Sequence, residues 1–458
     1  MVQHRALLFR RLKLVNFENA STPKQLNWRC NLTGSLSGTG PLNLLVISHA
    51  LPPSLYPQSI QVGRLLNHLD HRIHAITNYN DPNREKSKDV EFNSPFKLFK
   101  IIEVKALSKL PLWATLWVKR IVPIIGKIPD EHRQWARQAT KVAIDYIENS
   151  KIKFDVIITF GEPMSSHLVG LELNRRYQIP WIAHFSDPWS DNPFRRLQKL
   201  SNVINQRLES QVLNACDLAI FNSIETVRLV TKKYPNKIAE KCDVLPHSFD
   251  RADFLGHPRK KPNGKITIRF IGNFYNQRNP FPLFRAIRNM LIIDPGIFQS
   301  VQFELIGHTP KWMKLWLLKS PTITPYVTFH QPVSYQQSLK LMSTSDALLI
   351  IDAASDLSVF LPSKLIDYIG ARKPIMGIVP FGASRKLILE LEGIIADPKD
   401  DKEVAAMLHK AISGLKCPKK ESSEWTAPEV RKKFEVATNV ETFNRLIRRC
   451  IAGEYHEG

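Results

Sequence analysis

Short apolar runs that end in polar turns and lead into helical segments recur along this chain, and this alternation most restricts its fold. Two such segments lie far apart, at residues 155–191 and 346–378. Strands that alternate with helices predict parallel, doubly wound sheets. The sequence therefore predicts an α/β protein in which two separate domains offer strand ends and helix N-termini, with their unpaired amides, to an anionic ligand.

Glycine is missing from the turn in which many cofactor-binding enzymes need it. The first predicted strand, residues 42–48, leads into a loop at residues 49–58 that contains three prolines and no glycine. This loop lacks the glycine-rich fingerprint that lets a backbone approach a dinucleotide pyrophosphate. The sequence therefore argues against a nicotinamide or flavin enzyme, and no cofactor is expected.

The predicted elements alternate along both halves of the chain. Further strands are predicted at residues 73–77, 154–160, 181–185, 218–222, 242–245, 266–271, 302–306, 327–329 and 347–351. Helices are predicted at residues 59–69, 131–149, 202–215, 282–290, 334–342 and 429–451. A polar, turn-rich stretch at residues 251–265 predicts the domain boundary. The expected organisation is a loosely ordered tail (1–40), an N-terminal domain (41–255), a C-terminal domain (256–420) and a C-terminal segment (421–458).

The size of the chain indicates how many domains it has, and its charge indicates which classes of ligand it attracts. Its 458 residues exceed what one hydrophobic core ordinarily serves, which also indicates two domains. Lys and Arg outnumber Asp and Glu by 64 to 42, and the formal charge of +22 attracts phosphates, anionic lipids or nucleic acids. The sequence contains no zinc-knuckle spacing, RNA-binding aromatic signature or uninterrupted basic arm. No nucleic-acid partner is therefore expected.

The cysteines indicate a reducing compartment. The five cysteines are odd in number and widely scattered, and none belongs to a CxxC pair. This pattern argues against a disulfide framework and against a zinc site. We therefore expect no metal and a cytoplasmic location.

One segment has the composition of a membrane-surface helix. Residues 110–126 are too interrupted by Lys119 and Arg120 to span a bilayer. Trp113 and Trp117 lie one helical turn apart beside these two cations, which is typical of a segment that lies in the headgroup layer. Two alternatives stay open: peripheral contact with the anionic inner face of a membrane, and an ordinary amphipathic helix packed on the first domain.

Polar residues follow two predicted strands of the first domain at the edge where such sheets bind ligands. Glu162 follows the strand at residues 154–160, and His184 and Asp187 lie at the end of the strand at residues 181–185. Carboxylates and imidazole gathered at strand ends need a ligand or each other to offset their desolvation. These three residues are the candidate catalytic or orienting groups. The alternatives are a buried structural histidine at 184 and a helix-capping carboxylate at 187.

The strongest single signal is the helix start at residues 360–370, which reads FLPSKLIDYIG. Ser363 is predicted to cap this helix, and Lys364 lies in the first turn, where free amides favour an anion. A lysine is normally favoured at the opposite end of a helix, so Lys364 indicates a phosphate that it neutralises. Asp367 has the spacing to accept hydrogen bonds from two ribose hydroxyls. The alternative is a solvated helix start.

The segments IPWIAHFSDPW, FIGNF and PSKLIDYIGARKPI, with the order of the elements, resemble the family 4 glycosyltransferases of the GT-B fold. The resemblance covers residues 42–451. It implies two Rossmann-like domains that face each other across a cleft, with a nucleotide-sugar donor on the C-terminal domain and the acceptor on the N-terminal one. Members of the family generally retain anomeric configuration and need no metal. The final helix is then expected to cross back to the first domain, with a terminal helix on the second domain as the alternative.

The resemblance also points to donor-binding positions. Gly272 matches the glycine beside the donor diphosphate, and Arg278 is expected to act as a basic diphosphate ligand. Asp367 takes the place of the second glutamate of the family's E-x7-E pattern, whereas the first glutamate falls at Val359. The candidate donor-binding residues are therefore Gly272, Asn273, Arg278, Ser363, Lys364 and Asp367.

The predicted function is transfer of a sugar from a nucleotide-sugar donor to a glycan or lipid-linked acceptor in cell-surface polysaccharide synthesis. Helix amides and cations would neutralise the departing diphosphate, whose phosphate can itself take the acceptor proton. Two alternatives stay open. A non-catalytic protein of the same fold would bind a nucleotide or glycan, and Val359 in place of a glutamate favours it. A UDP-sugar 2-epimerase would need more carboxylates in the cleft than the sequence offers.

Overall fold

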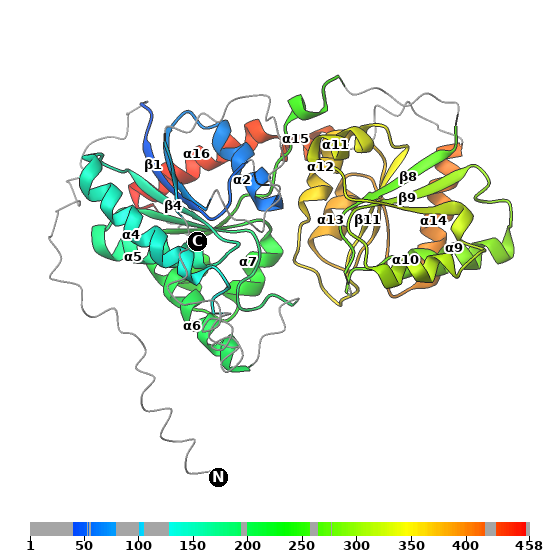
Figure 1. Ribbon diagram of the computed structural model, residues 1–458, viewed down its shortest axis with the longest axis horizontal. Coiled ribbons are helices and arrows are strands. Elements are labelled where there is room, and N and C mark those ends of the chain that lie inside the picture. Colours follow the sequence, from blue (N-terminus) through cyan, green and yellow to red (C-terminus); the bar gives the residue numbers. More distant parts are fainter. Residues whose placement is uncertain are drawn as a thin grey trace, which may run out of the picture.

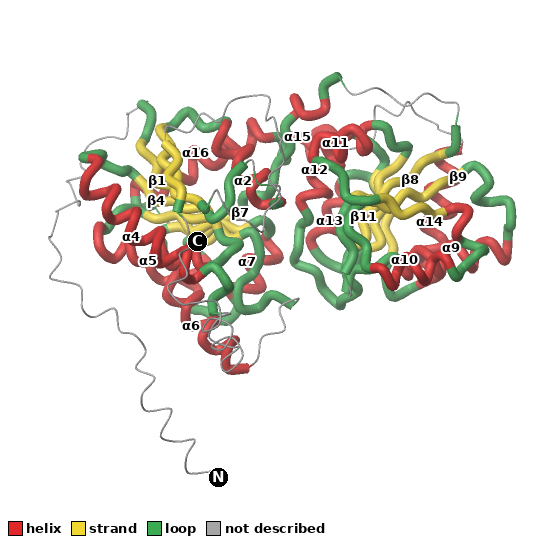
Figure 2. The backbone as a smooth tube through the Cα atoms, viewed as in Figure 1, coloured by secondary structure: helices red, strands yellow, loops and turns green. Residues whose placement is uncertain are grey.

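The computed structural model describes residues 40–52, 54, 56–78, 100–104, 128–193, 199–256, 264–275, 277–416 and 427–454. These residues form two α/β domains that lie side by side, each built on a parallel sheet with helices on both faces (Figure 1; Figure 2). The predicted membrane-surface segment at residues 110–126 and the predicted tail, except for Gly40, lie outside the described residues. No helix in the described part of the chain is long and apolar enough to cross a membrane.

The first sheet has seven strands in the order β3-β2-β1-β4-β5-β6-β7, and its neighbouring strands are parallel. The strands are β1 (Asn43–Ser48), β2 (Arg72–Thr77), β3 (Lys100–Glu103), β4 (Val156–Phe160), β5 (Trp181–Phe185), β6 (Leu218–Phe221) and β7 (Cys242–Val244). The strand order reverses between β1 and β4. In doubly wound sheets, ligands bind beyond the strand ends at this reversal.

Side chains of the first sheet alternate between two layers of helices. Leu45 and Ile47 of β1 pack in one apolar cluster, and Leu44 and Val46 pack in another on the opposite face. The first cluster includes α4 (Arg133–Ser150), α5 (Ser165–Tyr177), α6 (Lys199–Ala215), α7 (Ile224–Thr231) and α8 (Asn236–Ala239). The second includes α2 (Pro57–Asn67) and α16 (Val436–Ala452). Because both faces are covered, the strands read as continuous apolar runs.

The second sheet has six parallel strands in the order β10-β9-β8-β11-β12-β13. The strands are β8 (Ile266–Ile271), β9 (Val301–Ile306), β10 (Val327–His330), β11 (Ala347–Ile351), β12 (Ile375–Ile378) and β13 (Ile394–Ala396). One face is covered by α9 (Phe281–Ile293), α10 (Lys311–Leu318) and α14 (Asp401–Lys416). The other is covered by α11 (Tyr335–Ser343), α12 (Ser363–Ala371) and α13 (Ala383–Glu390). Here the strand order reverses between β8 and β11.

The predicted elements agree closely with the observed ones. Three predicted strands coincide with β5, β8 and β11, and every other predicted element except the last helix ends within three residues of its observed bounds. Strands β3, β12 and β13 have no counterpart among the predicted strands, although the equally short β6, β7 and β10 do.

The single helix predicted at residues 429–451 is wrong. The chain forms α15 (Pro428–Lys432), leaves the helix, and begins α16 at Val436. The Phe249 amide donates to the Phe434 carbonyl at 2.9 Å, and the Val436 amide donates to the Phe249 carbonyl at 2.9 Å. These ladder bonds to a segment far away in the sequence replace the helical bonds that local periodicity favours.

The last helix returns to the first domain. Phe443, Leu446 and Ile447 of α16 are buried in the same apolar cluster as α2 and the β1 and β4 strands. Figure 1 shows α16 beside α2 on one face of the first sheet, far along the chain from the residues it covers. The two ends of the described chain therefore complete one core.

Replacing Phe443 with alanine is expected to destabilise the first domain by roughly 3–5 kcal/mol, because a fully buried aromatic side chain leaves a cavity. The urea midpoint of unfolding measures this loss. Arg445→Ala changes an exposed residue of the same helix and serves as the control. Equal midpoints for the two variants would show that α16 does not belong to this core.

Candidate functional site

A cleft of about 790 Å³ lies between the two domains, at the carboxyl edges of both sheets. Its size is typical of small-molecule sites. The first domain lines it with Tyr56, Pro57, Gln58, Ile60, Gln61, Glu162, Ser186, Asp187, Asn192, Asn222 and His247. The second domain contributes, among others, Gly272, Asn273, Arg278, Ser363, Lys364 and Asp367. The cleft thus brings together every predicted site residue except His184.

Two loops that meet at glycines form part of the second domain's wall. Gly307, after β9, has a φ of 138°, and a Cβ at this position would lie 2.1 Å from the Gly272 carbonyl oxygen. Only glycine permits two backbones to approach this closely. The Asn273 Oδ1 atom secures the same contact by accepting a hydrogen bond from the His308 amide at 3.0 Å. In this structure Asn273 therefore positions the loops that hold Gly272 at the cleft.

Arg278 is fixed at the end of β11 by a buried carboxylate. Its Nη2 atom lies 3.2 Å from the Asp352 Oδ1 atom, and its guanidinium carbon lies 5.3 Å from the centre of the Tyr275 ring. Asp352 is itself held, because it accepts hydrogen bonds from the Ala353 amide and the Ser358 hydroxyl. The buried Arg278 Nε atom has no hydrogen-bond partner among the described residues. The structure thus places a cation that is held by Asp352 at the cleft wall.

The start of α12 presents its amides to the cleft, but the predicted Ser363 cap is wrong. Pro362 occupies the capping position in an extended conformation, no side chain caps the helix, and Ser363 is its first helical residue. A serine that has already entered the helix cannot bond the third amide as a cap does. The Leu365 amide donates to the Pro362 carbonyl at 3.0 Å, so the amides left for a ligand at this part of the cleft wall are those of Ser363 and Lys364.

Lys364 and Asp367 belong to one polar cluster. The Lys364 Nζ atom lies 3.2 Å from the Ser338 hydroxyl, 3.4 Å from the Asp367 Oδ2 atom and 4.9 Å from the centre of the Tyr335 ring. Lys364 remains 29% exposed, whereas Asp367 is 2% exposed. The ammonium group is therefore accessible to a ligand in the cleft, and the carboxylate lies behind it.

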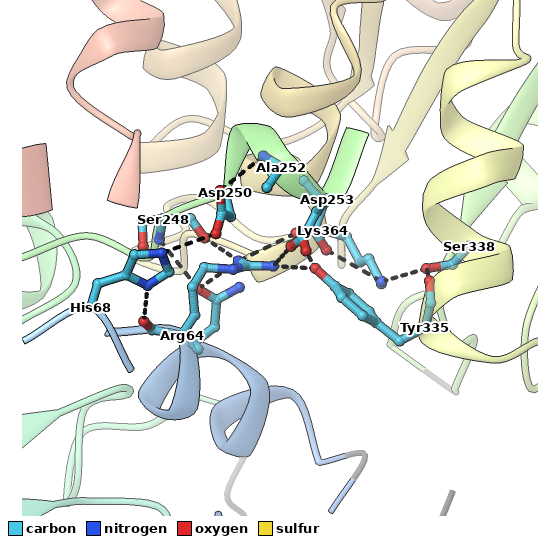
Figure 3. Close-up of polar contacts among 11 residues, drawn as sticks. Arg64, His68, Ser248, Asp250, Ala252, Asp253, Tyr335, Ser338 and Lys364 are labelled. Carbon is cyan, nitrogen blue, oxygen red and sulfur yellow. Dashed lines mark hydrogen bonds and ion pairs between the residues drawn. The ribbon is translucent and has the colours of Figure 1, made fainter. Parts of the chain in front are cut away.

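Arg64 of α2 reaches from the first domain into this cluster (Figure 3). Its guanidinium donates to the Ser248 carbonyl, to the Tyr335 hydroxyl and, at 3.0 Å, to the Asp253 carboxylate. Its Nη1 atom lies 3.8 Å from the Asp367 Oδ1 atom, which also accepts from the Tyr335 hydroxyl at 3.1 Å. Ser248 and Asp253 belong to the chain between β7 and β8, which is the interdomain segment. One buried cation thus joins the first domain, this segment and the second domain.

The electrostatics of this cluster favour the ionised form of Arg64. Burial by itself lowers the pKa of Arg64, but the surrounding Tyr335, Asp367 and Asp253 groups raise that pKa above its ordinary value. Next to it, His68 bonds the Asp250 carboxylate at 3.1 Å, and this bond raises the pKa of His68. Figure 3 shows the His68–Asp250 contact next to the Arg64 side chain.

A second contact between the domains occupies the position at which the family pattern has its first glutamate. Val359 is buried, and its carbonyl oxygen accepts hydrogen bonds from the Ser223 hydroxyl at 2.9 Å and the Thr226 hydroxyl at 3.2 Å. The Lys386 ammonium lies 2.6 Å from the Glu225 carboxylate nearby. The backbone of this loop is therefore tied to α7 of the first domain, and Val359 offers no carboxylate to a sugar.

The first domain's wall carries the two predicted carboxylates. Glu162 follows β4 with a φ of 75°, a conformation that residues other than glycine rarely adopt and that often marks functional sites. Asp187 faces the second domain across the cleft. Burial raises the pKa of Tyr275, Arg278 opposes the rise, and the Asp352 and Asp187 carboxylates add to it.

His184 lies behind this wall rather than on it. It lines a separate cavity of about 20 Å³ with Phe160 and Leu65, which has room for about one water molecule. Burial lowers the pKa of His184 to about 3, so its ring is neutral, and its Nδ1 atom has no hydrogen-bond partner among the described residues. Ser186 and His247 line both the cavity and the cleft. The predicted grouping of His184 with Glu162 and Asp187 at one surface does not occur.

Sequence reasoning missed Arg64, Tyr335 and His247. Arg64 follows the buried Ile60 by four residues, so a charge on the apolar stripe of a predicted helix is the signal that could have found it. Nothing local distinguishes Tyr335 or His247. Among the described residues, no group of three or more His, Cys, Asp or Glu side chains could hold a metal ion.

No protein-family model and no curated protein sequence matches the chain. Solved structures nevertheless share its fold. The Anabaena protein HepE, in complex with UDP and glucose, is similar with a TM-score of 0.59 and 12% identity over 89% of this chain and 99% of that chain. Sucrose-phosphate synthase from Thermosynechococcus elongatus is similar with a TM-score of 0.64 and 15% identity, over 90% of this chain and 100% of that chain. The lipopolysaccharide outer core galactosyltransferase WaaB is similar with a TM-score of 0.58 and 13% identity, over 89% of this chain and 99% of that chain. These likenesses confirm the predicted fold of two Rossmann-like domains.

Replacing Arg64 with alanine is expected to lower the stability of the protein by roughly 3–5 kcal/mol, because it leaves the buried Asp367 and the half-buried Asp253 without this cation. Arg64→Lys keeps the positive charge but loses the forked arrangement of N–H donors. Its stability should therefore lie between those of wild type and Arg64→Ala. Urea midpoints at neutral pH report the loss. A free energy of unfolding for Arg64→Ala within about 0.5 kcal/mol of the wild-type value would show that the cluster does not hold the domains together.

Acid is expected to destabilise the fold through the buried His167 and His184 and the half-buried His247. Burial lowers the pKa values of His167 and His184 to about 3 and of His247 to about 4. The unfolded chain binds protons at these residues below about pH 6.5, so stability is lost as the pH falls from there toward 4. The urea midpoint should fall between pH 7 and pH 5, and less so in His184→Leu. The exposed His409 of α14 provides the control variant His409→Asn. An equal fall in all three proteins would contradict this assignment.

Proposed function

We propose that this protein transfers a sugar from a nucleotide-sugar donor to a glycan or lipid-linked acceptor. The observation that carries the proposal is the second-domain wall, where the first amides of α12, the partly exposed Lys364 side chain and the Arg278 guanidinium held by Asp352 line one part of the cleft. Amides at a helix start and fixed cations favour a phosphate group. The fold shared with HepE in complex with UDP and glucose, and with a galactosyltransferase, supports this reading.

The proposed reaction places the charge that develops against these groups. The bond from the anomeric carbon to the donor diphosphate breaks, a bond to the acceptor oxygen forms, and the acceptor proton passes to the departing phosphate. Lys364 and Arg278 stabilise the departing diphosphate by fixed charge, which is the role that a metal ion fills in other enzymes. The proposal is therefore a retaining, metal-independent transfer of the family 4 type, in cell-surface polysaccharide synthesis at the inner face of the cytoplasmic membrane.

The two walls take different parts in this proposal. Glu162 and Asp187 on the first domain orient the acceptor hydroxyl, and His184 supports that wall from behind. Asp367 is proposed to accept hydrogen bonds from the donor ribose through oxygens that Arg64, Tyr335 and Lys364 already hold. UDP is the first nucleotide to test, because HepE is described in complex with UDP.

A non-catalytic binding protein of the same fold is the second candidate. The buried Val359 favours it, because the loop that carries a glutamate in the family pattern here offers only a backbone carbonyl, which the first domain holds. A UDP-sugar 2-epimerase has less support, because only Glu162, Asp187 and Asp367 are acidic among the residues that line the cleft from the described chain. Turnover separates these readings.

The test is release of UDP from UDP-glucose and UDP-galactose in the presence of a panel of glycan acceptors. Lys364→Ala is expected to lower kcat by about 10²–10³-fold, as does the loss of one donor aimed at a developing negative charge. Lys410→Ala removes the same charge from the exposed face of α14 and should leave kcat unchanged. Equal turnover in the two variants would remove Lys364 from the mechanism. Saturable UDP binding without release from any donor would favour the non-catalytic candidate.

A further inference from the structure

Helix α10 exposes large apolar side chains on one side. Trp312, Leu315 and Leu318 are 48%, 56% and 70% exposed, and a spacing of three residues keeps them on one side of the helix. The opposite side carries Met313 and Leu317, which are buried in the core of the second domain. This helix therefore has one apolar side that packs on its own domain and a second apolar side that does not.

Helix α9 extends the same surface. Right-handed connections from β8 to β9 and from β9 to β10 place α9 and α10 on one face of the sheet and in the same direction. The Phe281 ring stacks on Trp312 at 5.6 Å, and the Phe284 ring stacks on Trp316 at 5.4 Å, so the two helices touch. Figure 1 shows them together along one side of the second domain. Ile292 and Ile293, at the end of α9, are 77% and 85% exposed.

These five exposed residues (Ile292, Ile293, Trp312, Leu315 and Leu318) define the α9–α10 face. They are five of the fourteen large apolar side chains that are exposed in the described part of the chain, although the two helices contain few of its residues. Isolated exposed apolar residues are ordinary, whereas a gathering on adjacent elements marks an interaction surface.

The charge around the α9–α10 face selects the partner. Lys311, Lys314 and Lys319 flank the apolar residues of α10, and Arg288 is exposed on α9. No Asp or Glu occurs between Glu304 and Asp346, so α10 carries no acidic residue, whereas Asp294 is exposed directly after Ile293 at the end of α9. Leucine and tryptophan surrounded by lysines form the pattern of a helix that lies in a lipid interface, where the lysines meet anionic headgroups and the rings and chains enter below them.

We propose that the α9–α10 face docks on an anionic lipid surface. A second copy of the chain fits less well, because a two-fold contact through this face would bring the lysines of one copy against those of the other. The net charge of +22 favours the same partner at longer range. None of the residues that define this surface belongs to the segment at residues 110–126.

Docking here would bring the cleft to the membrane. Helix α10 begins at Lys311, a few residues after Gly307, which lines the cleft. The apolar side of α10 therefore starts beside the cleft rim on the second domain. If the proposed glycosyl transfer holds, a face so close to the donor wall favours an acceptor that is anchored in the same lipid surface. Only this last step rests on the proposed function.

The test is sedimentation of the full-length protein with vesicles of phosphatidylcholine, with and without roughly one-third phosphatidylglycerol. Wild type is expected to bind the anionic vesicles and to lose binding as salt is raised. Leu315→Ser/Leu318→Ser should weaken that binding about tenfold or more, whereas Leu357→Ser/Leu389→Ser, which changes similarly exposed leucines elsewhere, should not.

Charge is tested in the same assay. Replacing Lys311, Lys314 and Lys319 with glutamine should weaken binding, and replacing the exposed Lys141, Lys151 and Lys237 of the first domain, with the same change in net charge, should weaken it much less. The proposal would be overturned if wild type did not bind anionic vesicles. It would also be overturned if the leucine and lysine variants of the α9–α10 face bound them as tightly as wild type does. So would a dimer that the leucine variant abolishes, because it would assign the face to a second copy. Titration with UDP is expected to be the same for all variants, so a failure here is distinct from a failure of the proposed function.

Discussion

The Arg64 guanidinium is a positive charge buried between two domains, and the placement of the groups around the cleft depends on how that charge is paired. A buried cation is tolerated only where carboxylates and hydrogen-bond acceptors surround it. Arg64 finds them in Ser248 and Asp253 of the interdomain segment and in Tyr335 and Asp367 of the second domain. Together with the Ser223 contact to Val359, this pairing sets how the two sheets face each other.

The same pairing links the junction to the proposed donor site. Asp367 accepts from Tyr335 and lies within ion-pair distance of Arg64 and Lys364, so its carboxylate is shared before any ligand arrives. A ribose that bonds Asp367 must share it with Arg64. Nucleotide binding and the attachment of the domains are then coupled through one carboxylate, in the sense that each alters the free energy of the other.

The sequence predicts the architecture well because both sheets are buried on two faces, so their strands are continuous apolar runs between polar turns. It predicts the helix start at Lys364 because that signal is local. The sequence does not predict features that depend on contacts with residues far away along the chain. The break before α16 depends on Phe249, and the role of Arg64 depends on Asp367, which lies about three hundred residues away. The grouping of His184 with Glu162 and Asp187 is wrong because a position at a strand end does not give the depth of a side chain beneath the cleft wall.

The proposed function depends most on the binding of a diphosphate in the cleft. Calorimetric titration of the purified protein with UDP, UMP and uridine, and with GDP and ADP in parallel, tests it most directly. We predict micromolar binding of one nucleoside diphosphate, with affinity that falls about tenfold or more when the terminal phosphate is removed, because charged hydrogen bonds to Lys364, Arg278 and the α12 amides are lost. Equal binding of UDP and uridine, or no binding of any nucleotide, would contradict it.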